Sequence, residues 1–216
     1  MGFGPMSATG HSNRVFSVKF HPDDPNVVLS GGWDNTVLIW DTRTGLAERS
    51  IYSPHLAGDS LDVHNGVVLT GSHRSGGASL ETWDYGTGQK IEQVEWTDDT
   101  TRDPTSLYAA QYKADRSDYT SSPRFIATGG SGGTTGNEAR VFDCTNNNAC
   151  VGFVGGMKRG IFSVDWSSTE DKMACAGGDS CIRIVKVVTK NAGDKKVAAA
   201  EEGVEGMSRG GKREGE

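Results

Sequence analysis

The sequence predicts an all-β fold made of small antiparallel sheets, and three observations lead to it. Short apolar runs that are rich in β-branched and aromatic residues recur along the chain up to about residue 188. Turn-forming clusters of Gly, Asn, Asp and Pro separate these runs, and 30 glycines among 216 residues suit a turn-rich chain. The runs follow one another without a segment of helical period, which favours a meander of neighbouring strands.

The stretch from Gly10 to Gly45 shows this organisation most clearly. Pro22 and Pro25 fall between its first two apolar runs, and they belong in a turn because proline donates no ladder hydrogen bond. A second turn begins with the flexible pair Gly31-Gly32. We therefore expect strands at 15–20, 27–30 and 36–40, followed by an outer fourth strand at 46–52.

Two dipeptides bound this stretch, Gly10-His11 at its start and Trp40-Asp41 at the end of its third strand. In spacing, turn chemistry and both dipeptides it resembles one blade of a WD-repeat β-propeller. In that family a buried Asp, His, Ser or Thr and Trp form a hydrogen-bonded staple within each blade. The resemblance assigns these roles to Asp34, His11, Ser30 and Trp40.

His11, Ser30 and Asp34 are also the residue types of a hydrolase triad, in which Ser30 would be the nucleophile and His11 its base. Ser30 lies within a strand pattern and lacks the strained, glycine-flanked elbow that presents a nucleophilic serine. A fully satisfied buried network accounts for the same three residues. We therefore expect no catalytic residues, and the hydrolase remains the alternative.

Three weaker repeats follow. In the second, Asn65-Gly66 is the strongest two-residue hairpin signal, and an outer strand is expected at 91–96. In the third, the glycine-rich segment 129–136 lacks the Lys-Ser/Thr ending and the helix of a phosphate-binding loop, so we expect an ordinary loop. The remaining strands are expected near 60–64, 67–70, 79–84, 107–112, 125–128, 139–143, 161–166, 172–179 and 182–187, which leaves the last blade with three.

The closing positions Trp40, Trp83, Phe142 and Val185 are separated by 43, 59 and 43 residues. WD repeats have a period of about 40–45 residues, so the third repeat is enlarged by insertions. Thr70 and Trp83 keep part of a staple in the second repeat. We expect an N-terminal segment at 1–9, a propeller region at 10–190 with blades near 10–53, 58–97, 105–154 and 155–188, and a disordered tail at 191–216.

Composition argues against several classes of function. The net charge of −6 offers no basic excess for nucleic acid, and no apolar run approaches the ~20 residues that cross a bilayer. The N-terminus lacks a signal pattern, so we expect an intracellular protein, cytoplasmic rather than nuclear. The cysteines form two C-x5-C pairs, wider than the usual spacing of zinc ligands, so we expect neither a metal nor a cofactor.

The resemblance implies a non-catalytic scaffold for protein–protein interaction within a larger assembly, whose partners the sequence does not name. About four repeats are fewer than this family usually needs for a closed ring. The chain is therefore expected to be a fragment of a longer protein; an oligomeric ring, self-association through unclosed edges, a tight small ring or a fragment without independent function are alternatives. The candidates for partner binding are Trp33, Arg14, Arg74 and Arg159, in or beside loops.

Overall fold

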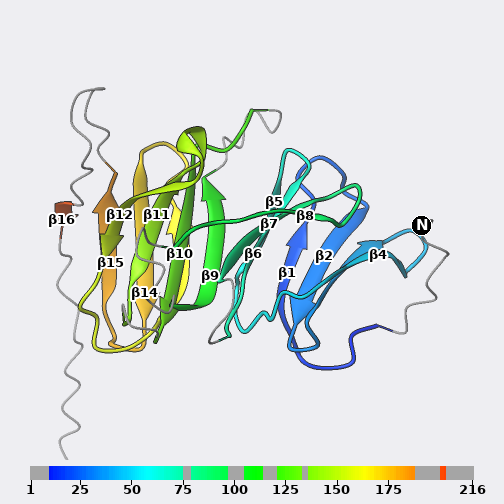
Figure 1. Ribbon diagram of the computed structural model, residues 1–216, viewed down its shortest axis with the longest axis horizontal. Helices are drawn as coiled ribbons and strands as arrows, with labels where there is room; N and C mark the ends of the chain where they lie inside the picture. The colour runs from blue at the N-terminus through cyan, green and yellow to red at the C-terminus, as the bar shows by residue number, and fades with distance from the viewer. Residues whose placement is uncertain are drawn as a thin grey trace, which may run out of the picture.

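The computed structural model describes residues 10–74, 79–96, 105–113, 121–132 and 136–187, together with the backbone of Ala200–Glu202. It contains four antiparallel sheets of four strands, each joined in sequence order. Figure 1 shows the sheets side by side along the long axis, from the blue first sheet at the right to the orange last sheet at the left. The all-β prediction is confirmed, and within the described residues the only helical element is the 3₁₀ turn η1, Cys144–Asn146.

We refer to the four sheets as blades 1 to 4. Blade 1 contains β1 (Val15–Phe20), β2 (Val27–Gly32), β3 (Thr36–Asp41) and β4 (Leu46–Tyr52), and blade 2 contains β5 (Leu61–His64), β6 (Val67–Gly71), β7 (Leu80–Asp84) and β8 (Lys90–Gln93). Blade 3 contains β9 (Ser106–Lys113), β10 (Phe125–Ser131), β11 (Ala139–Asp143) and β12 (Ala149–Val154), and blade 4 contains β13 (Ile161–Trp166), β14 (Lys172–Gly177), β15 (Ile182–Lys186) and β16 (Ala200–Glu202).

Hydrophobic cores fill the spaces between successive blades. Because side chains alternate between the two faces of a strand, each inner blade can contribute apolar side chains to both of its neighbours. Leu29 and Ile39 of blade 1 pack with Trp83 of blade 2, and Phe142 of blade 3 packs with Leu69 of blade 2. A third core joins blades 3 and 4. The blades therefore form one continuous body.

The first strands of the blades lie next to one another, and one carboxylate connects three of them. Asp59, which precedes β5, accepts hydrogen bonds from Ser17 Oγ at 3.1 Å, Lys19 Nζ at 3.3 Å and Gln111 Nε2 at 3.2 Å. Asp62 accepts the backbone N–H of Tyr112 at 2.9 Å, and burial raises the pKa of this carboxyl. These contacts hold blades 1, 2 and 3 in a fixed arrangement.

The propeller is not closed. Ser17 and Lys19 point toward blade 2, so Val18 and Phe20 lie on the opposite face of blade 1, where they are 58% and 69% exposed. At the other end of the molecule, Ile182 of blade 4 is 61% exposed. Blades 1 and 4 occupy opposite ends of the row in Figure 1. Each terminal blade therefore keeps one uncovered face.

The structure corrects three expectations about the strands. β8 ends at Gln93 instead of continuing to Trp96, whose ring turns inward and lies 5.6 Å from that of Phe142. Gly129 and Gly130, expected in a loop, belong to β10. A Cβ atom on Gly129 would lie 2.5 Å from the Ile161 side chain, and one on Gly130 would lie 2.3 Å from the Ser106 carbonyl oxygen. These glycines therefore permit the close approach of neighbouring strands.

The third correction concerns the last blade, for which the sequence predicts three strands. Ala200–Glu202 forms a fourth strand, β16, which pairs with β15 in antiparallel register. The free edge of β15 offers unpaired backbone donors and acceptors, and a nearby segment of the same chain satisfies them. The disorder expected for the rest of 191–216, like the segment 1–9, lies outside the described residues.

Candidate functional site

The staple residues of blade 1 form one hydrogen-bonded chain. His11 Nδ1 lies 2.8 Å from Asp34 Oδ2, and His11 Nε2 lies 2.7 Å from Ser30 Oγ, which also accepts the indole N–H of Trp40 at 2.7 Å. A carboxylate only accepts, so Nδ1 carries the ring proton and Nε2 accepts the Ser30 hydroxyl proton. Every polar group of the staple therefore has a partner.

This geometry also meets the distance requirements of a Ser-His-Asp triad. Ser30 is only 6% exposed, however, and it lies in β2 between β1 and β3. Its oxygen already accepts the Trp40 N–H, which occupies a lone pair beside the hydroxyl. The arrangement can hold β2, β3 and the segment before β1 together without presenting a nucleophile to solvent.

Later blades use different polar networks. In blade 2 the Trp83 N–H donates to Thr70 Oγ1 at 2.8 Å, so half of the staple remains. In blade 3 the Phe142 ring has no N–H to donate. There a buried ion pair joins Glu138 Oε1 to Arg140 Nε at 2.7 Å, with side chains 3% and 9% exposed.

This ion pair was not predictable from the sequence, because its carboxylate collects donors from separate segments. Glu138 Oε1 also accepts the Trp96 indole N–H at 3.0 Å and the Thr105 hydroxyl at 3.3 Å. Arg140 Nη1 donates to the Trp96 carbonyl oxygen at 2.5 Å. The network connects the end of blade 2 to blade 3.

The four residues proposed for partner binding lie at one end of the propeller, which we call the loop face. Trp33 occupies the β2–β3 turn and is 37% exposed, and Arg14 precedes β1 with its guanidinium 5.2 Å from the Trp33 ring centre. Arg74 follows β6, and Arg159 precedes β13. All three arginines are exposed. Nothing in the structure tests their role in binding.

Aromatic rings cross the loop face in two connected groups, which together we call the aromatic row. Trp33 lies 5.0 Å from Phe16 and stacks on His55 at 6.2 Å. Tyr108 lies 4.2 Å from His73 and 4.9 Å from Phe162. The backbone N–H of His73 donates to the backbone carbonyl oxygen of His55 at 2.8 Å, and this hydrogen bond joins the two groups. The row therefore runs across residues from all four blades.

A repeated backbone feature places three of these rings. In blades 1, 3 and 4 the first strand has one extra residue opposite the second strand, and that residue is Phe16, Tyr108 and Phe162 respectively. Such a β-bulge redirects the side chain it carries. The sequence analysis missed these rings, although the aligned pairs Val15-Phe16, Leu107-Tyr108 and Ile161-Phe162 carried a usable signal.

The two histidines of the row behave as neutral aromatic rings. Burial lowers the pKa of both, and the positive charge of Arg74 lowers the pKa of His55 further. Asn35 Oδ1 accepts from His55 Nδ1 at 2.8 Å and from Arg74 Nη2 at 2.6 Å. The exposed Arg74 is thereby held beside the row.

The described part of the chain bears on metal binding and on the crossing of a bilayer. It holds no group of three or more His, Cys, Asp and Glu side chains placed for a metal ion. Burial raises the pKa of Cys150 and raises that of Cys144 to about 12, which disfavours the thiolate that binds metals. Among these residues we find no helix with the length and apolar character needed to span a bilayer.

Comparison with known proteins identifies the repeat. Residues 5–41 and 148–186 match the family described as WD domain, G-beta repeat. The chain is 33% identical to human Coronin-2A over 107 residues, which cover 50% of this chain and 18% of Coronin-2A. It is 23% identical over 180 residues to protein transport protein SEC31 of Saccharomyces cerevisiae, covering 79% of this chain and 14% of that protein.

A third relative is mouse WD repeat-containing protein 25, 32% identical over 95 residues that cover 41% of this chain and 18% of that protein. The match with each of these three relatives spans less than a fifth of the relative's length. Among solved structures, the computationally designed Ika4 protein superposes with a TM-score of 0.60 at 18% identity, covering 85% of this chain and 98% of Ika4. That likeness supports the fold.

Proposed function

This chain carries WD repeats of a β-propeller, and from that premise we propose that it is a non-catalytic scaffold for protein–protein interaction that uses its loop face. The observation that carries the proposal is the gathering of Trp33, Arg14, Arg74 and Arg159 at one end of the propeller. Trp and Arg side chains are enriched among the residues that dominate binding energy at protein interfaces.

The construction of the blades supports a rigid platform. Shared hydrophobic cores join all four blades, and the Asp59 carboxylate connects blades 1, 2 and 3 close to the loop face. Loops fixed on such a body are ordered before a partner arrives, so binding loses less conformational entropy. Loops that are ordered before binding suit a protein that serves as a scaffold.

The setting is also part of the proposal. We place the chain in the cytoplasm, where its four cysteines would stay reduced. Its partners are other proteins, with no nucleic acid or membrane among them. The uncovered faces with Phe20 and Ile182 provide for self-association or for packing of further blades in a longer protein.

Replacing Trp33 with alanine should weaken partner binding about tenfold or more, as expected for an aromatic hot spot. The free energy of unfolding should fall by only about 1–2 kcal/mol, because the ring packs on Phe16 and His55 at the surface, so the chain should stay folded. The measurement compares proteins recovered from a cell lysate on immobilised wild-type and variant chains by quantitative mass spectrometry. Phe153→Ala, which removes a 61% exposed ring of β12, is the matched control. Equal recovery on Trp33→Ala and wild type would refute the role of the loop face.

The triad-like geometry keeps a hydrolase as the second candidate, and a covalent probe separates the two. A serine-directed fluorophosphonate should leave Ser30 unlabelled, because its hydroxyl is buried and bonded to His11 and Trp40. The measurement is intact-mass spectrometry of the folded chain after incubation with the probe, with a known serine hydrolase as positive control. Labelling that disappears in Ser30→Ala would establish a reactive serine and overturn the scaffold assignment for this site.

A further inference from the structure

We propose that the loop face binds an extended acidic polypeptide segment, with apolar side chains on the aromatic row and carboxylates on Arg14, Arg74 and Arg159. The inference rests on the proposed function and specifies the chemistry of the partner. It follows from three features of this face. Its aromatic rings are exposed, its arginines have no carboxylate partner among the described residues, and its acidic residues are paired with other side chains.

The exposed rings offer an apolar track. Phe16 and Trp33 are each 37% exposed and Phe162 is 50% exposed, although all three belong to a structure with well-filled cores. Phe16, Tyr108 and Phe162 reach this face through the same β-bulge in three different blades. The rings therefore lie along a line across the blades, which suits an extended segment better than a compact ligand.

Within the described part of the chain, the arginines beside the row have no acidic partner. No carboxylate of the described ranges lies within ion-pair distance of Arg14, Arg74 or Arg159. Arg14 stacks on Trp33, and Arg74 contacts the amide oxygen of Asn35. Exposed Lys158 adds a further cation next to Arg159. Guanidinium donors that remain open in this way suit carboxylates.

Acidic residues of the described ranges at this end are bonded to their own partners. Asp34 is paired with His11, Glu138 with Arg140 and Asp179 with Arg183, and these carboxylate side chains are 6%, 3% and 5% exposed. Asp59, whose side chain is 46% exposed, is paired with Lys19. The loop face therefore presents exposed arginines although the whole chain has a net charge of −6. A negatively charged segment would meet complementary charge there.

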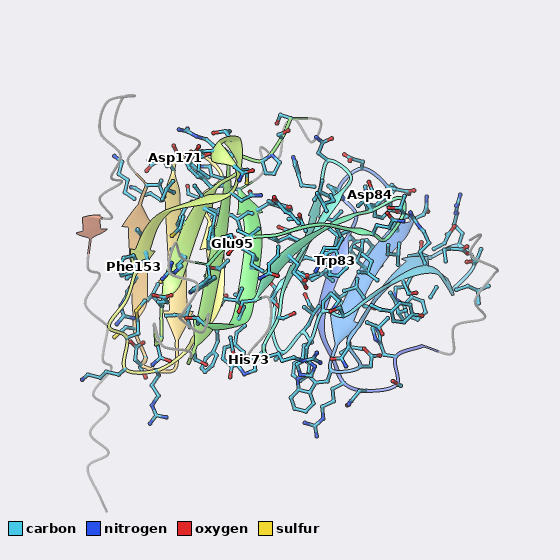
Figure 2. The ribbon with its side chains drawn as sticks, viewed as in Figure 1. His73, Trp83, Asp84, Glu95, Phe153 and Asp171 are labelled. Atoms are coloured by element: carbon cyan, nitrogen blue, oxygen red, sulfur yellow. The ribbon has the colours of Figure 1, made fainter. Side chains whose placement is uncertain are left out.

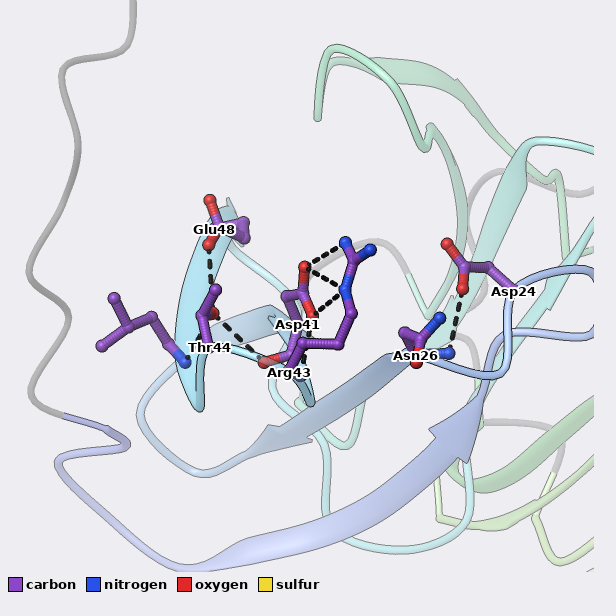
Figure 3. A network of polar contacts seen from close by, with 7 residues as sticks. Asp24, Asn26, Asp41, Arg43, Thr44 and Glu48 are labelled. Carbon is purple, nitrogen blue, oxygen red and sulfur yellow. Dashed lines mark hydrogen bonds and ion pairs between the residues drawn. The ribbon is translucent and has the colours of Figure 1, made fainter.

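The opposite end carries charges of both signs. Asp24, Asp84 and Asp143 accept hydrogen bonds from backbone N–H groups, while Asp171 is paired with Lys113 and Arg124. Figure 3 shows the Arg43 guanidinium bound to Asp41 at this end, with Asp24 nearby. The hydrogen bonds from Arg43 lower the pKa of Asp41 to about 2. Figure 2 shows His73 at the lower end of the molecule and Asp84 and Asp171 at the upper end. Cations that are already bonded to carboxylates at this end are less available to an acidic segment than the three arginines of the loop face.

The test uses fluorescence anisotropy of a labelled peptide in which Glu alternates with Leu and Phe, titrated with the full chain. Its binding should be about tenfold or more tighter than that of the same peptide with Gln for Glu, and should weaken as salt rises. The triple variant Arg14→Gln/Arg74→Gln/Arg159→Gln should lose at least about tenfold in affinity. Arg43→Gln, at the opposite end, is the matched control and should bind as wild type does.

Each outcome decides the proposal. Equal binding of the Glu and Gln peptides, or unchanged binding by the triple variant, would overturn the assignment of an acidic ligand. Tighter binding of a single-stranded oligonucleotide of matched length would replace the peptide with nucleic acid. If lysate partners are lost in Trp33→Ala while the acidic peptide does not bind, the scaffold function stands and this inference fails. If Trp33→Ala keeps its partners, the scaffold function itself fails.

Discussion

Replacing Glu138 with alanine is expected to lower the free energy of unfolding by about 3–5 kcal/mol, because it leaves a buried arginine without its counter-ion. Arg140 is only 9% exposed in its side chain, and its Nε donates to Glu138 Oε1 at 2.7 Å. The same oxygen accepts the indole N–H of Trp96, which would lose its partner too.

Urea unfolding followed by tryptophan fluorescence and by circular dichroism measures this loss. The double variant Glu138→Leu/Arg140→Met should recover part of the lost stability, since no charge is then stranded in the interior. Glu170→Ala removes a carboxylate that is 54% exposed and paired with Lys172, and it should leave the unfolding midpoint unchanged. Equal midpoints for Glu138→Ala and wild type would show that the buried pair does not connect blades 2 and 3.

Replacing Phe142 with alanine is expected to cost about 3–5 kcal/mol through the lost apolar burial and the cavity it leaves. Phe142 is 0% exposed, pairs with Ile126 across β10 and β11, and packs with Trp96 between blades 2 and 3. Its neighbours come from two separate blades, so they cannot collapse into the space without changing the angle between the blades.

Differential scanning calorimetry and urea unfolding measure the effect. Phe142→Leu should lose less than Phe142→Ala because it keeps most of the side-chain volume. Phe20→Ala makes the same chemical change at a ring that is 69% exposed, and should alter stability by less than about 0.5 kcal/mol. A similar loss in Phe20→Ala and Phe142→Ala would contradict the burial of Phe142.

Much of the fold follows from local sequence signals. Turn residues and apolar runs locate the strands, as in the Asn65-Gly66 hairpin, whose φ angles of 46° and 72° are the positive values such a pair favours. Features set by contacts between blades were not predictable in the same way. Trp96 turns inward to reach Phe142, and Gly129 extends a strand because Ile161 of the next blade approaches it. The strand at Ala200–Glu202 depends on the free edge of β15.

The candidate site, too, was predictable only where local sequence signals determine it. The staple residues follow from the repeat pattern, and the structure brings His11, Ser30, Asp34 and Trp40 together. Trp33 was found because a large aromatic residue at a turn is conspicuous. The rest of the aromatic row depends on an extra residue in the register of three strands, which no single repeat reveals.

The exposed arginines gathered at the loop face give the molecule one locally positive region. A charged partner would exert a torque on the molecule during diffusional encounter, so the two molecules would be partly oriented before they touch. Over distances beyond a Debye length of about 10 Å at 0.1 M salt this torque is screened. Ionic strength would therefore control mainly how fast complexes form, whereas the stacking of apolar side chains on Trp33 and Phe162 would control how long they last.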